Sequence, residues 1–165
     1  MVKLDKVDMQ ILKLLQEDGR LNNAEIAKRV FLSPPACWKR LKFLEQEVIK
    51  NYRAFIEPKS LGYNFYAFMN ITLDLHSEEC MQHFEEEIMK IDNVIACHNI
   101  SGRYDYLLHL VVKDMDDFHN VSMIKIRTIG NIKEMNTSFS IREIKSFKGL
   151  LICSLFSIRF TANAI

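Results

Sequence analysis

The sequence predicts an α+β protein with an N-terminal helix-turn-helix (winged) domain and a C-terminal ferredoxin-like βαββαβ domain. Three observations support this fold class: apolar residues at helical spacing in the first part, β-branched and aromatic segments alternating with amphipathic ones in the second, and basic charge concentrated in the first. We expect the first domain over residues 1–57, a linker over 58–64, the second domain over 65–149 and an apolar C-terminal extension over 150–165.

The composition is that of an ordinary globular protein, since 48% of the 165 residues are hydrophobic and 26% are charged. Disordered, collagen-like and low-complexity classes are therefore excluded. No uninterrupted apolar run approaches the roughly 20 residues of a membrane helix, and the N-terminus carries charge where a signal peptide is apolar, so we expect a cytoplasmic protein. The four cysteines form no C-x-x-C pair, which favours reduced thiols over a disulfide framework or zinc ribbon.

Capping residues delimit the first two helices. Asp5 is a good N-cap for the first helix, and Asp18-Gly19 is expected to end it with the glycine in the left-handed conformation. Asn22, followed three residues later by Glu25, resembles a capping box. The second helix is therefore expected over residues 23–30, with Ile26, Ala27 and Val30 facing inward.

A third helix opens at Ser33, with Pro34 in its first turn, and is expected to run to about Gln46. At 100° per residue its core stripe consists of Cys37, Leu41, Leu44 and Val48. The opposite arc holds Pro35, Lys39, Lys42 and Gln46, with Trp38 on one flank. A short second helix, a tight turn and a third helix with a basic outer face are typical of the helix-turn-helix motif, whose last helix enters the major groove of DNA.

The charge distribution agrees with this interpretation. Residues 1–62 carry a net charge of +4 and the remaining residues −3. Between Lys28 and Lys42 there are five basic residues and no acidic one. A basic patch confined to one segment indicates contact with a polyanion, although charge runs also form merely solvated faces.

Position along the third helix assigns the expected roles in DNA contact. The residues placed to reach base edges lie near its start: Pro35, Ala36, Trp38 and Lys39. Lys42 and Arg29 are expected to contact phosphates, and Ser33, with the free N–H groups behind it, to hold another phosphate. Arg40 either contacts a phosphate or buttresses the helix by pairing with an acid such as Glu45 or Asp8. Trp38 either packs on a thymine methyl or against the second helix or a partner subunit.

The rest of the chain alternates strands and helices. Residues 48–56 are expected to form a wing or connecting strand, and later strands are expected over 65–75, 94–100, 104–112 and 132–144. Ser77 opens one intervening helix, with Phe84, Ile88 and Ile91 buried, and Asp114 caps the other, which carries Phe118, Val121, Ile124 and Ile126. The βαββαβ order places both helices on one face of the sheet, and we expect a second subunit to cover the other face.

Two runs of residues resemble a known family. Leu4-Asp5-x-x-Asp8-x-x-Ile11-Leu12 and the run from Leu32 to Leu41 look like the DNA-binding half of Lrp/AsnC (feast/famine) transcriptional regulators, and Ser101-Gly102-Arg103-Tyr104-Asp105 resembles a motif of their regulator domain. The match covers about residues 4–148. The resemblance implies a sequence-specific, double-stranded-DNA-binding regulator, a homodimer that assembles into tetramers or octamers, and an amino acid or related metabolite bound between dimers.

The resemblance also implies an effector site. Gly102, Tyr104 and Asp105 fall where the family's ligand loop lies, with Thr137, Ser138 and Ser140 on the last strand nearby. Asp105 would receive an ammonium group and the loop amides around Gly102 a carboxylate. Alternatively, Asp105 only caps the turn by accepting N–H groups of its own loop. Arg103 stands where many relatives carry an acid, so their ligand preference does not transfer.

Three departures from the family pattern affect the expected structure. Glu45-Gln46-Glu47 leads directly into Val48 without the usual glycine, which changes the exit of the third helix. Gly130-Asn131 replaces a Pro-Gly turn, and asparagine tolerates the left-handed region. The tail from Leu150 to Ile165 is apolar, and we expect it to pack on an oligomer surface or add a strand.

Enzyme motifs are absent from the sequence: it has no glycine-rich phosphate loop, no H-E-x-x-H and no nucleophile elbow. We therefore expect no catalytic residues, no cofactor and no metal site. Two alternatives stay open. His76, Cys80 and His83 have a spacing that could begin a transition-metal site. Sirohaem decarboxylases resemble this architecture and use histidines, which His98, His109 and His119 would supply.

Overall fold

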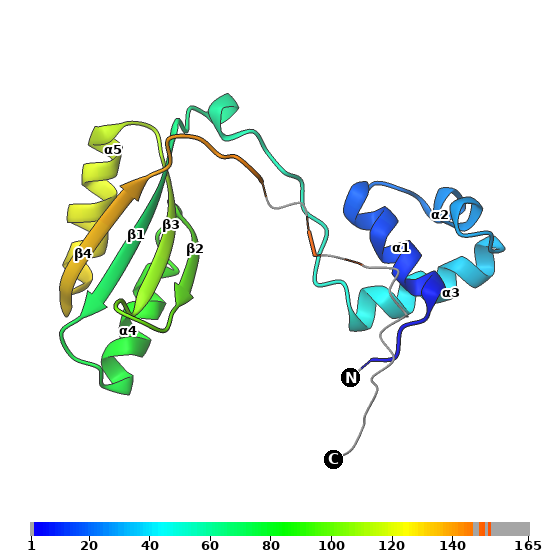
Figure 1. Ribbon diagram of the computed structural model, residues 1–165, viewed down its shortest axis with the longest axis horizontal. Coiled ribbons are helices and arrows are strands. Elements are labelled where there is room, and N and C mark those ends of the chain that lie inside the picture. The colour runs from blue at the N-terminus through cyan, green and yellow to red at the C-terminus, as the bar shows by residue number, and fades with distance from the viewer. Residues whose placement is uncertain (1, 147–148, 151, 153–165) are drawn as a thin grey trace, which may run out of the picture. The chain divides into compact units, whose positions relative to one another are not determined.

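The computed structural model describes residues 2–146, 149–150 and 152. The described residues form two compact units, one over residues 2–55 and the other over Ile56–Ile144. Figure 1 shows the helices of the first unit and the sheet of the second. Among the described residues, no helix is both long enough and apolar enough to cross a membrane.

The N-terminal unit consists of three helices: α1 (Lys6–Glu17), α2 (Asn23–Arg29) and α3 (Pro34–Glu47). Its buried core has one or two side chains from each helix and from the turn after α2: Ile11, Ile26, Ala27, Val30, Cys37 and Leu44. The inward positions predicted for the second helix are confirmed. In the predicted stripe of the third helix Cys37 and Leu44 are fully buried, whereas Val48, one residue beyond the helix, is exposed.

Two of the predicted caps are confirmed. The Asp5 side chain accepts the N–H groups of Val7 and Asp8, and Asn22 and Glu25 form the reciprocal bonds of a capping box. The predicted end of the first helix is only partly right. Asp18 itself turns extended and accepts the N–H of Arg20, so Gly19 does not adopt a positive φ. The helix ends because an aspartate competes for backbone donors, and the glycine's conformational freedom is not used.

The strand predicted over residues 48–56 is wrong. This segment has no regular structure, and Tyr52, Phe55 and Ile56 are exposed. A strand requires a neighbour for its backbone hydrogen bonds, and within the described residues the four paired strands all lie between Phe65 and Phe139. Aromatic and β-branched composition alone therefore does not make a wing here.

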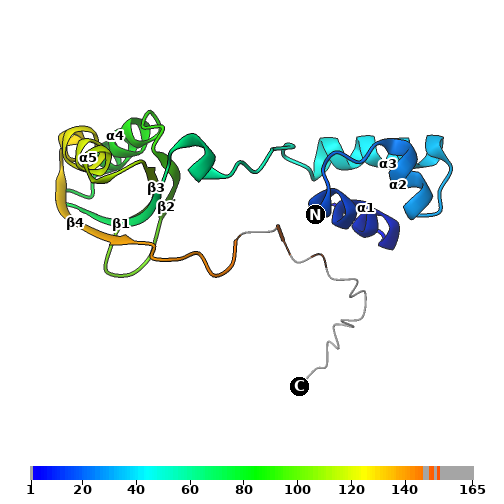
Figure 2. The same cartoon turned by 90° about the horizontal axis from the view of Figure 1, so that it is seen from above.

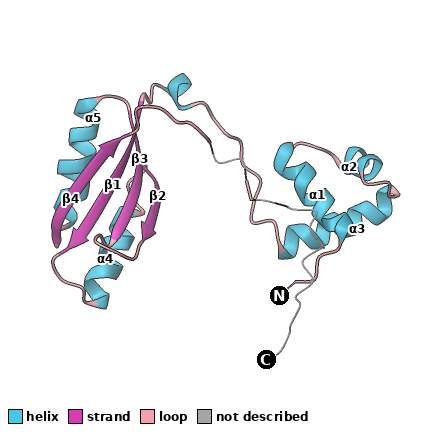
Figure 3. Ribbon diagram, in the orientation of Figure 1, coloured by secondary structure: helices cyan, strands magenta, loops and turns pink. Residues whose placement is uncertain are grey.

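The C-terminal unit is an antiparallel sheet with helices on one face. A short 3-10 turn over Pro58–Leu61 falls in the predicted linker. The strands are β1 (Phe65–Leu73), β2 (Val94–Asn99), β3 (Tyr106–Val112) and β4 (Ile132–Phe139), in the spatial order β2-β3-β1-β4. The helices are α4 (Glu78–Ile88) and α5 (Met115–His119), the latter continued as a π-helix over Asn120–Ile126. This is the predicted ferredoxin-like arrangement (Figure 3).

Strand register divides the side chains between two faces of the sheet. Both helices lie on the same side of it (Figure 2). On that side, Ala67, Met69 and Ile71 of β1 pack with Phe84 and Ile88 of α4. The other face carries Tyr66, Phe68, Asn70, Leu107, His109 and Ser138. It has no covering layer among the described residues of this chain.

Three local predictions in this unit have mixed outcomes. The Gly130-Asn131 turn keeps its shape, with φ values of 89° and 56°. The last strand ends at Phe139 rather than at residue 144, and Ile141 and Ile144 are exposed. Of the apolar residues expected on the second helix of this unit, Val121 and Ile126 are buried, whereas Ile124 is 57% exposed in the wider π-helical turn. The predicted packing of the tail 150–165 lies almost entirely outside the described residues, although Leu150 exchanges two hydrogen bonds with Gln16.

Candidate functional site

The outer face of α3 is exposed where the sequence places DNA contacts. Pro35, Ala36, Lys39 and Lys42 are all exposed, and the Trp38 side chain is 55% exposed. Cys37 and Leu44 occupy the opposite, buried face of the same helix. The helix therefore presents Trp38, Lys39 and Lys42 outward while its other face joins the core. More than half of Trp38 is therefore accessible to a contact from outside this unit.

The start of α3 is held by α2. The Asn23 amide donates to the Pro34 carbonyl at 2.9 Å, which fixes the turn between the two helices. Ser33 has the extended backbone of an N-cap, but its side chain makes no capping hydrogen bond to the described residues. Pro34 and Pro35 have no N–H group and the N–H of Cys37 bonds the Ser33 carbonyl, so the first turn offers an acceptor such as a phosphate the N–H of Ala36 and the exposed Ser33 hydroxyl.

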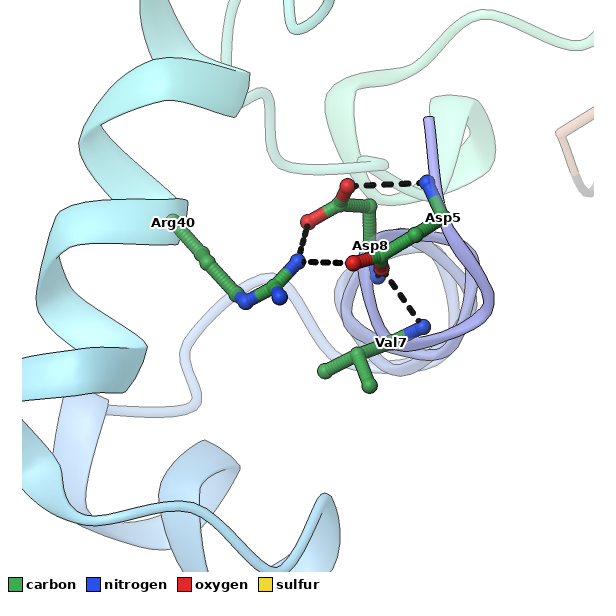
Figure 4. Close-up of polar contacts among 4 residues, drawn as sticks. All are labelled: Asp5, Val7, Asp8 and Arg40. Atoms are coloured by element: carbon green, nitrogen blue, oxygen red, sulfur yellow. Dashed lines mark hydrogen bonds and ion pairs between the residues drawn. The ribbon is translucent and has the colours of Figure 1, made fainter. Parts of the chain in front are cut away.

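Arg40 connects α3 to the beginning of α1 (Figure 4). Its Nη1 lies 2.6 Å from Asp5 Oδ2 and 2.7 Å from Asp8 Oδ1. The Asp8 side chain is only 7% exposed and that of Arg40 35%. The N–H of Asp8, and then the Arg40 guanidinium, lower the pKa of Asp5. This geometry favours the buttress role for Arg40 over a phosphate contact, with Asp8 as one of the two acids considered and Asp5 as an additional partner.

The remaining basic side chains differ in how far they are neutralised. Lys42 Nζ lies 3.0 Å from Glu45 Oε2 on the same helix, in an exposed pair. Lys28, Arg29 and Lys39 form no ion pair with any described residue, although Arg29 lies close enough to help lower the pKa of Asp18. Exposed helix pairs contribute little free energy, so Lys42 can exchange Glu45 for a phosphate at small cost.

The loop with the regulator motif lies beside the end of β1. Asp105 Oδ2 accepts the N–H of Leu73 at 2.8 Å, and His76 Nε2 lies 3.1 Å from the same oxygen. Within the described residues, Asp105 therefore caps the neighbouring strand rather than its own loop. Gly102 has a φ of 122°, and the space where a Cβ would project is open. The Arg103 guanidinium lies over the Tyr104 ring and 3.2 Å from Glu134.

The three residues expected near this loop, Thr137 and Ser138 on β4 and Ser140 just after it, are not gathered there within one chain. Thr137 pairs with Met69, so it lies on the helix-covered face, whereas Ser138 pairs with Phe68 on the open face. Ser140 follows beside Tyr66, to which its N–H donates. The β4 residue that does meet the loop is Glu134, at the other end of the strand. The sequence could not show this, because the register of β4 against β1 decides both face and position.

The histidines and cysteines do not form a metal centre within the described residues, where no group of three or more His, Cys, Asp or Glu side chains is placed to hold an ion. His76 hydrogen-bonds with Asp105, and it does not join Cys80 and His83 in a group placed to hold an ion. His109 lies on the open sheet face and stacks on Phe68, with ring centroids 4.6 Å apart. Burial lowers the pKa of His109.

Sequence reasoning missed two residues at the regulator loop, His76 and Glu134. His76 was considered only as a metal ligand, and Glu134 was not considered. The sequence does place His76 just after one predicted strand and Glu134 near the start of another. Because the ends of neighbouring antiparallel strands meet at one edge of the sheet, this pattern could have indicated both residues.

Comparisons with known proteins agree with both units. The family model described as "Winged helix-turn-helix DNA-binding" matches residues 4–47, and that described as "Lrp/AsnC ligand binding domain" matches residues 66–150. The leucine-responsive regulatory proteins of Klebsiella pneumoniae and Escherichia coli are each 33% identical over 150 residues, which cover 90% of this chain and 92% of theirs.

Solved structures give the same result. A transcriptional regulator from Neisseria meningitidis, crystallised with L-methionine, superposes with a TM-score of 0.86 at 33% identity over 90% of this chain and 96% of that one. An AsnC family regulator from Agrobacterium tumefaciens has a TM-score of 0.84 at 32% identity, over 89% and 96% of the two chains. The chain belongs to the Lrp/AsnC family of DNA-binding transcriptional regulators.

Proposed function

We propose that the exposed face of α3 reads duplex DNA. Pro35, Ala36, Trp38 and Lys39 lie toward the base edges in this proposal, and Lys42, Arg29 and the start of α3 at Ser33 contact phosphates. Arg40 is a positioning residue that holds α3 against α1. The observation that carries the proposal is the segment from Lys28 to Lys42, which holds five basic residues and no acidic one and ends on α3, a helix whose other face is buried.

The test is the combined variant Lys39→Ala with Lys42→Ala. The probe is a duplex that the wild-type protein itself selects from a random-sequence library. Removing two phosphate or base-edge cations should weaken binding, and the slope of log affinity against log salt should fall by up to about two, because fewer counterions are released. Lys6→Ala with Lys13→Ala on α1 makes the same change in net charge at two exposed positions and should leave the slope almost unchanged. Equal effects of the two variants would reject the assigned face.

We also propose that the loop at Gly102, Tyr104 and Asp105 binds an amino acid or a related small metabolite. Asp105 offers a carboxylate to an ammonium group, and the open space at Gly102 lets a ligand approach the loop backbone. The matching ligand-binding family model and the L-methionine complex of the Neisseria regulator support this assignment.

A second copy of the chain is part of this proposal. Ser138 and Ser140 lie at the opposite end of β4 from Glu134, so a site that combines them with the loop requires residues of two protomers. The uncovered sheet face, with Tyr66, Phe68 and the stacked His109, supplies an apolar surface for such pairing. We propose a homodimer that assembles further into a tetramer or octamer.

The effector proposal is tested with Asp105→Ala. Calorimetric titration with a panel of L-amino acids should show binding to the wild type and at least a tenfold weaker association for the variant, with basal DNA binding unchanged. Asp92→Ala, which removes an exposed carboxylate elsewhere in the same unit, is the matched control. Light scattering with and without the binding amino acid shows whether assembly responds. If Asp105→Ala still binds the effector as wild type does, the assigned role is refuted.

A further inference from the structure

The turn between α2 and α3 contains a residue whose conformation is costly. Phe31 has a φ of 56°, and among the described residues the only other positive φ outside glycine is that of Asn131. Asn131 is compensated, because its side-chain amide bonds both the N–H and the carbonyl of Leu75. A phenyl ring offers no such bonds. A non-glycine residue in this region is strained, because its Cβ lies too close to a neighbouring carbonyl oxygen.

The cost at Phe31 arises from the way α2 ends. Val30 is the C-cap, and the N–H of Leu32 bonds back to the carbonyl of Ala27 at 2.9 Å. That bond is the signature of a Schellman motif, in which the residue after the C-cap must be left-handed and is usually glycine. Phe31 occupies this position. The turn therefore needs nothing from the ring, and any residue with a Cβ is strained at this position.

Core packing does not account for the ring either. The Phe31 side chain is 94% exposed, more than Trp38 or Phe43 of the adjacent helix. A single exposed apolar side chain is ordinary on a protein surface, but backbone strain at the same residue is a feature of functional sites.

The surroundings of Phe31 indicate what that contact is. Lys28 and Arg29 lie in the last turn of α2 and line a surface hollow with Glu25. The Glu25 carboxylate bonds the N–H of Asn22 at 2.9 Å, so it is committed to the capping box. Ser33, two residues after Phe31, begins the helix that faces DNA in the function proposed above. An apolar ring inside a basic surface, next to the end of a groove-reading helix, fits duplex DNA better than an apolar protein partner.

We propose that Phe31 is a DNA-contacting residue, whose ring packs on apolar carbon at the groove edge where the N-terminal end of α3 enters. The carbon belongs either to a thymine methyl or to a deoxyribose. This inference rests on the proposed DNA-reading function of α3. It adds a contact that is independent of charge, so it contributes affinity without counterion release.

The test compares folding with DNA binding in Phe31→Gly. Glycine suits the left-handed position, so the midpoint of unfolding, followed by Trp38 fluorescence, should stay the same or rise. Affinity for the library-selected duplex should fall about tenfold, with the salt slope unchanged. Phe31→Tyr keeps a ring and should bind within about twofold of wild type. Replacing the thymines of the duplex one at a time with deoxyuridine distinguishes a thymine methyl from a deoxyribose carbon. If the ring contacts a thymine methyl, one replacement lowers the affinity of the wild type but not that of Phe31→Gly. If it contacts a sugar, no replacement has this effect.

Each contrary result is distinguishable. Unchanged affinity of Phe31→Gly, while Lys39→Ala with Lys42→Ala still weakens binding, overturns the Phe31 contact and leaves the proposed function standing. Destabilisation by Phe31→Gly shows a structural role and also overturns the inference. Unchanged DNA binding together with altered self-association would assign the ring to a protein contact instead. If wild type selects no duplex at all, the proposed function fails before the question of Phe31 arises.

Discussion

Asp8 in the N-terminal unit and Asp105 in the C-terminal unit both face a basic side chain, but the two carboxylates are held in different ways. Asp8 is almost buried, shares the Arg40 guanidinium with Asp5 and joins two helices. Asp105 accepts one strand N–H and faces His76, whose side chain is largely exposed. Removing one partner of a buried pair leaves a desolvated charge, whereas an exposed pair exchanges its partner readily. The first arrangement therefore serves folding, and the second suits a site that opens to a ligand.

The largest effect expected from this contrast is on Asp8. Asp8→Ala leaves Arg40 without its most buried partner and should lower the free energy of unfolding of the N-terminal unit by about 2 kcal/mol, since Arg40 keeps Asp5 and some solvent. Trp38 is the only tryptophan, so its fluorescence in a denaturant titration reports this unit. Lys42→Ala, which breaks an exposed pair on the same helix, should cost only a few tenths of a kcal/mol. Similar losses for both variants would contradict the structural role of the buried pair.

The second prediction concerns a polar pair inside the C-terminal unit. Tyr106 is buried and donates to Glu85 Oε1 at 2.8 Å, and burial, together with Glu85, raises the pKa of Tyr106 to about 12. Because the unfolded phenol titrates near pH 10, this contribution to stability is complete below pH 10 and is lost as pH rises through about 12.

Tyr106→Phe should remove this alkaline dependence and cost about 1 kcal/mol at neutral pH, because Glu85 loses one hydrogen bond but keeps access to water. Circular dichroism of the sheet as a function of pH follows the unit. Tyr104→Phe is the matched control, since Tyr104 has no such carboxylate partner among the described residues. A wild-type unit that is equally stable at pH 9 and pH 12 would show that the Tyr106–Glu85 bond is energetically irrelevant.

The two units also differ in how much of them was predictable from sequence. The N-terminal unit is governed by local signals: the caps at Asp5 and Asn22 and the inward face of α3 were predicted correctly because they depend on residues within one or two turns. The strand predicted over residues 48–56 is wrong, because a strand needs a hydrogen-bonding partner that is distant in the chain. The partners of Arg40 were only half predicted, since Asp5 was taken for a cap alone.

In the C-terminal unit the order of elements was predictable, but the candidate site was not. A shift of one residue moves a strand side chain to the other face of the sheet. Thr137 and Ser138 are neighbours in sequence yet lie on opposite faces, and the loop meets Glu134 instead of either. The predicted turn at residues 101–103 does lie between β2 and β3, while its surroundings depend on pairing between strands that are far apart in the chain.

The smallest predicted effect concerns His76, and it decides whether the exposed pair is exchangeable. His76 Nε2 lies 3.1 Å and 3.2 Å from the two Asp105 oxygens, so an ammonium group that binds Asp105 must displace the imidazole. His76→Ala should therefore strengthen binding of the amino acid that the wild type takes by about threefold, the size expected for losing an exposed competitor. His83 lies on α4 and makes no hydrogen bond to Asp105 in the described part of the chain, so His83→Ala is the control. Calorimetry measures both. Weaker amino-acid binding by His76→Ala would instead make His76 a ligand contact. Asp105 would then belong to a fixed pair, as Asp8 does, and the two carboxylates would not differ in the way described.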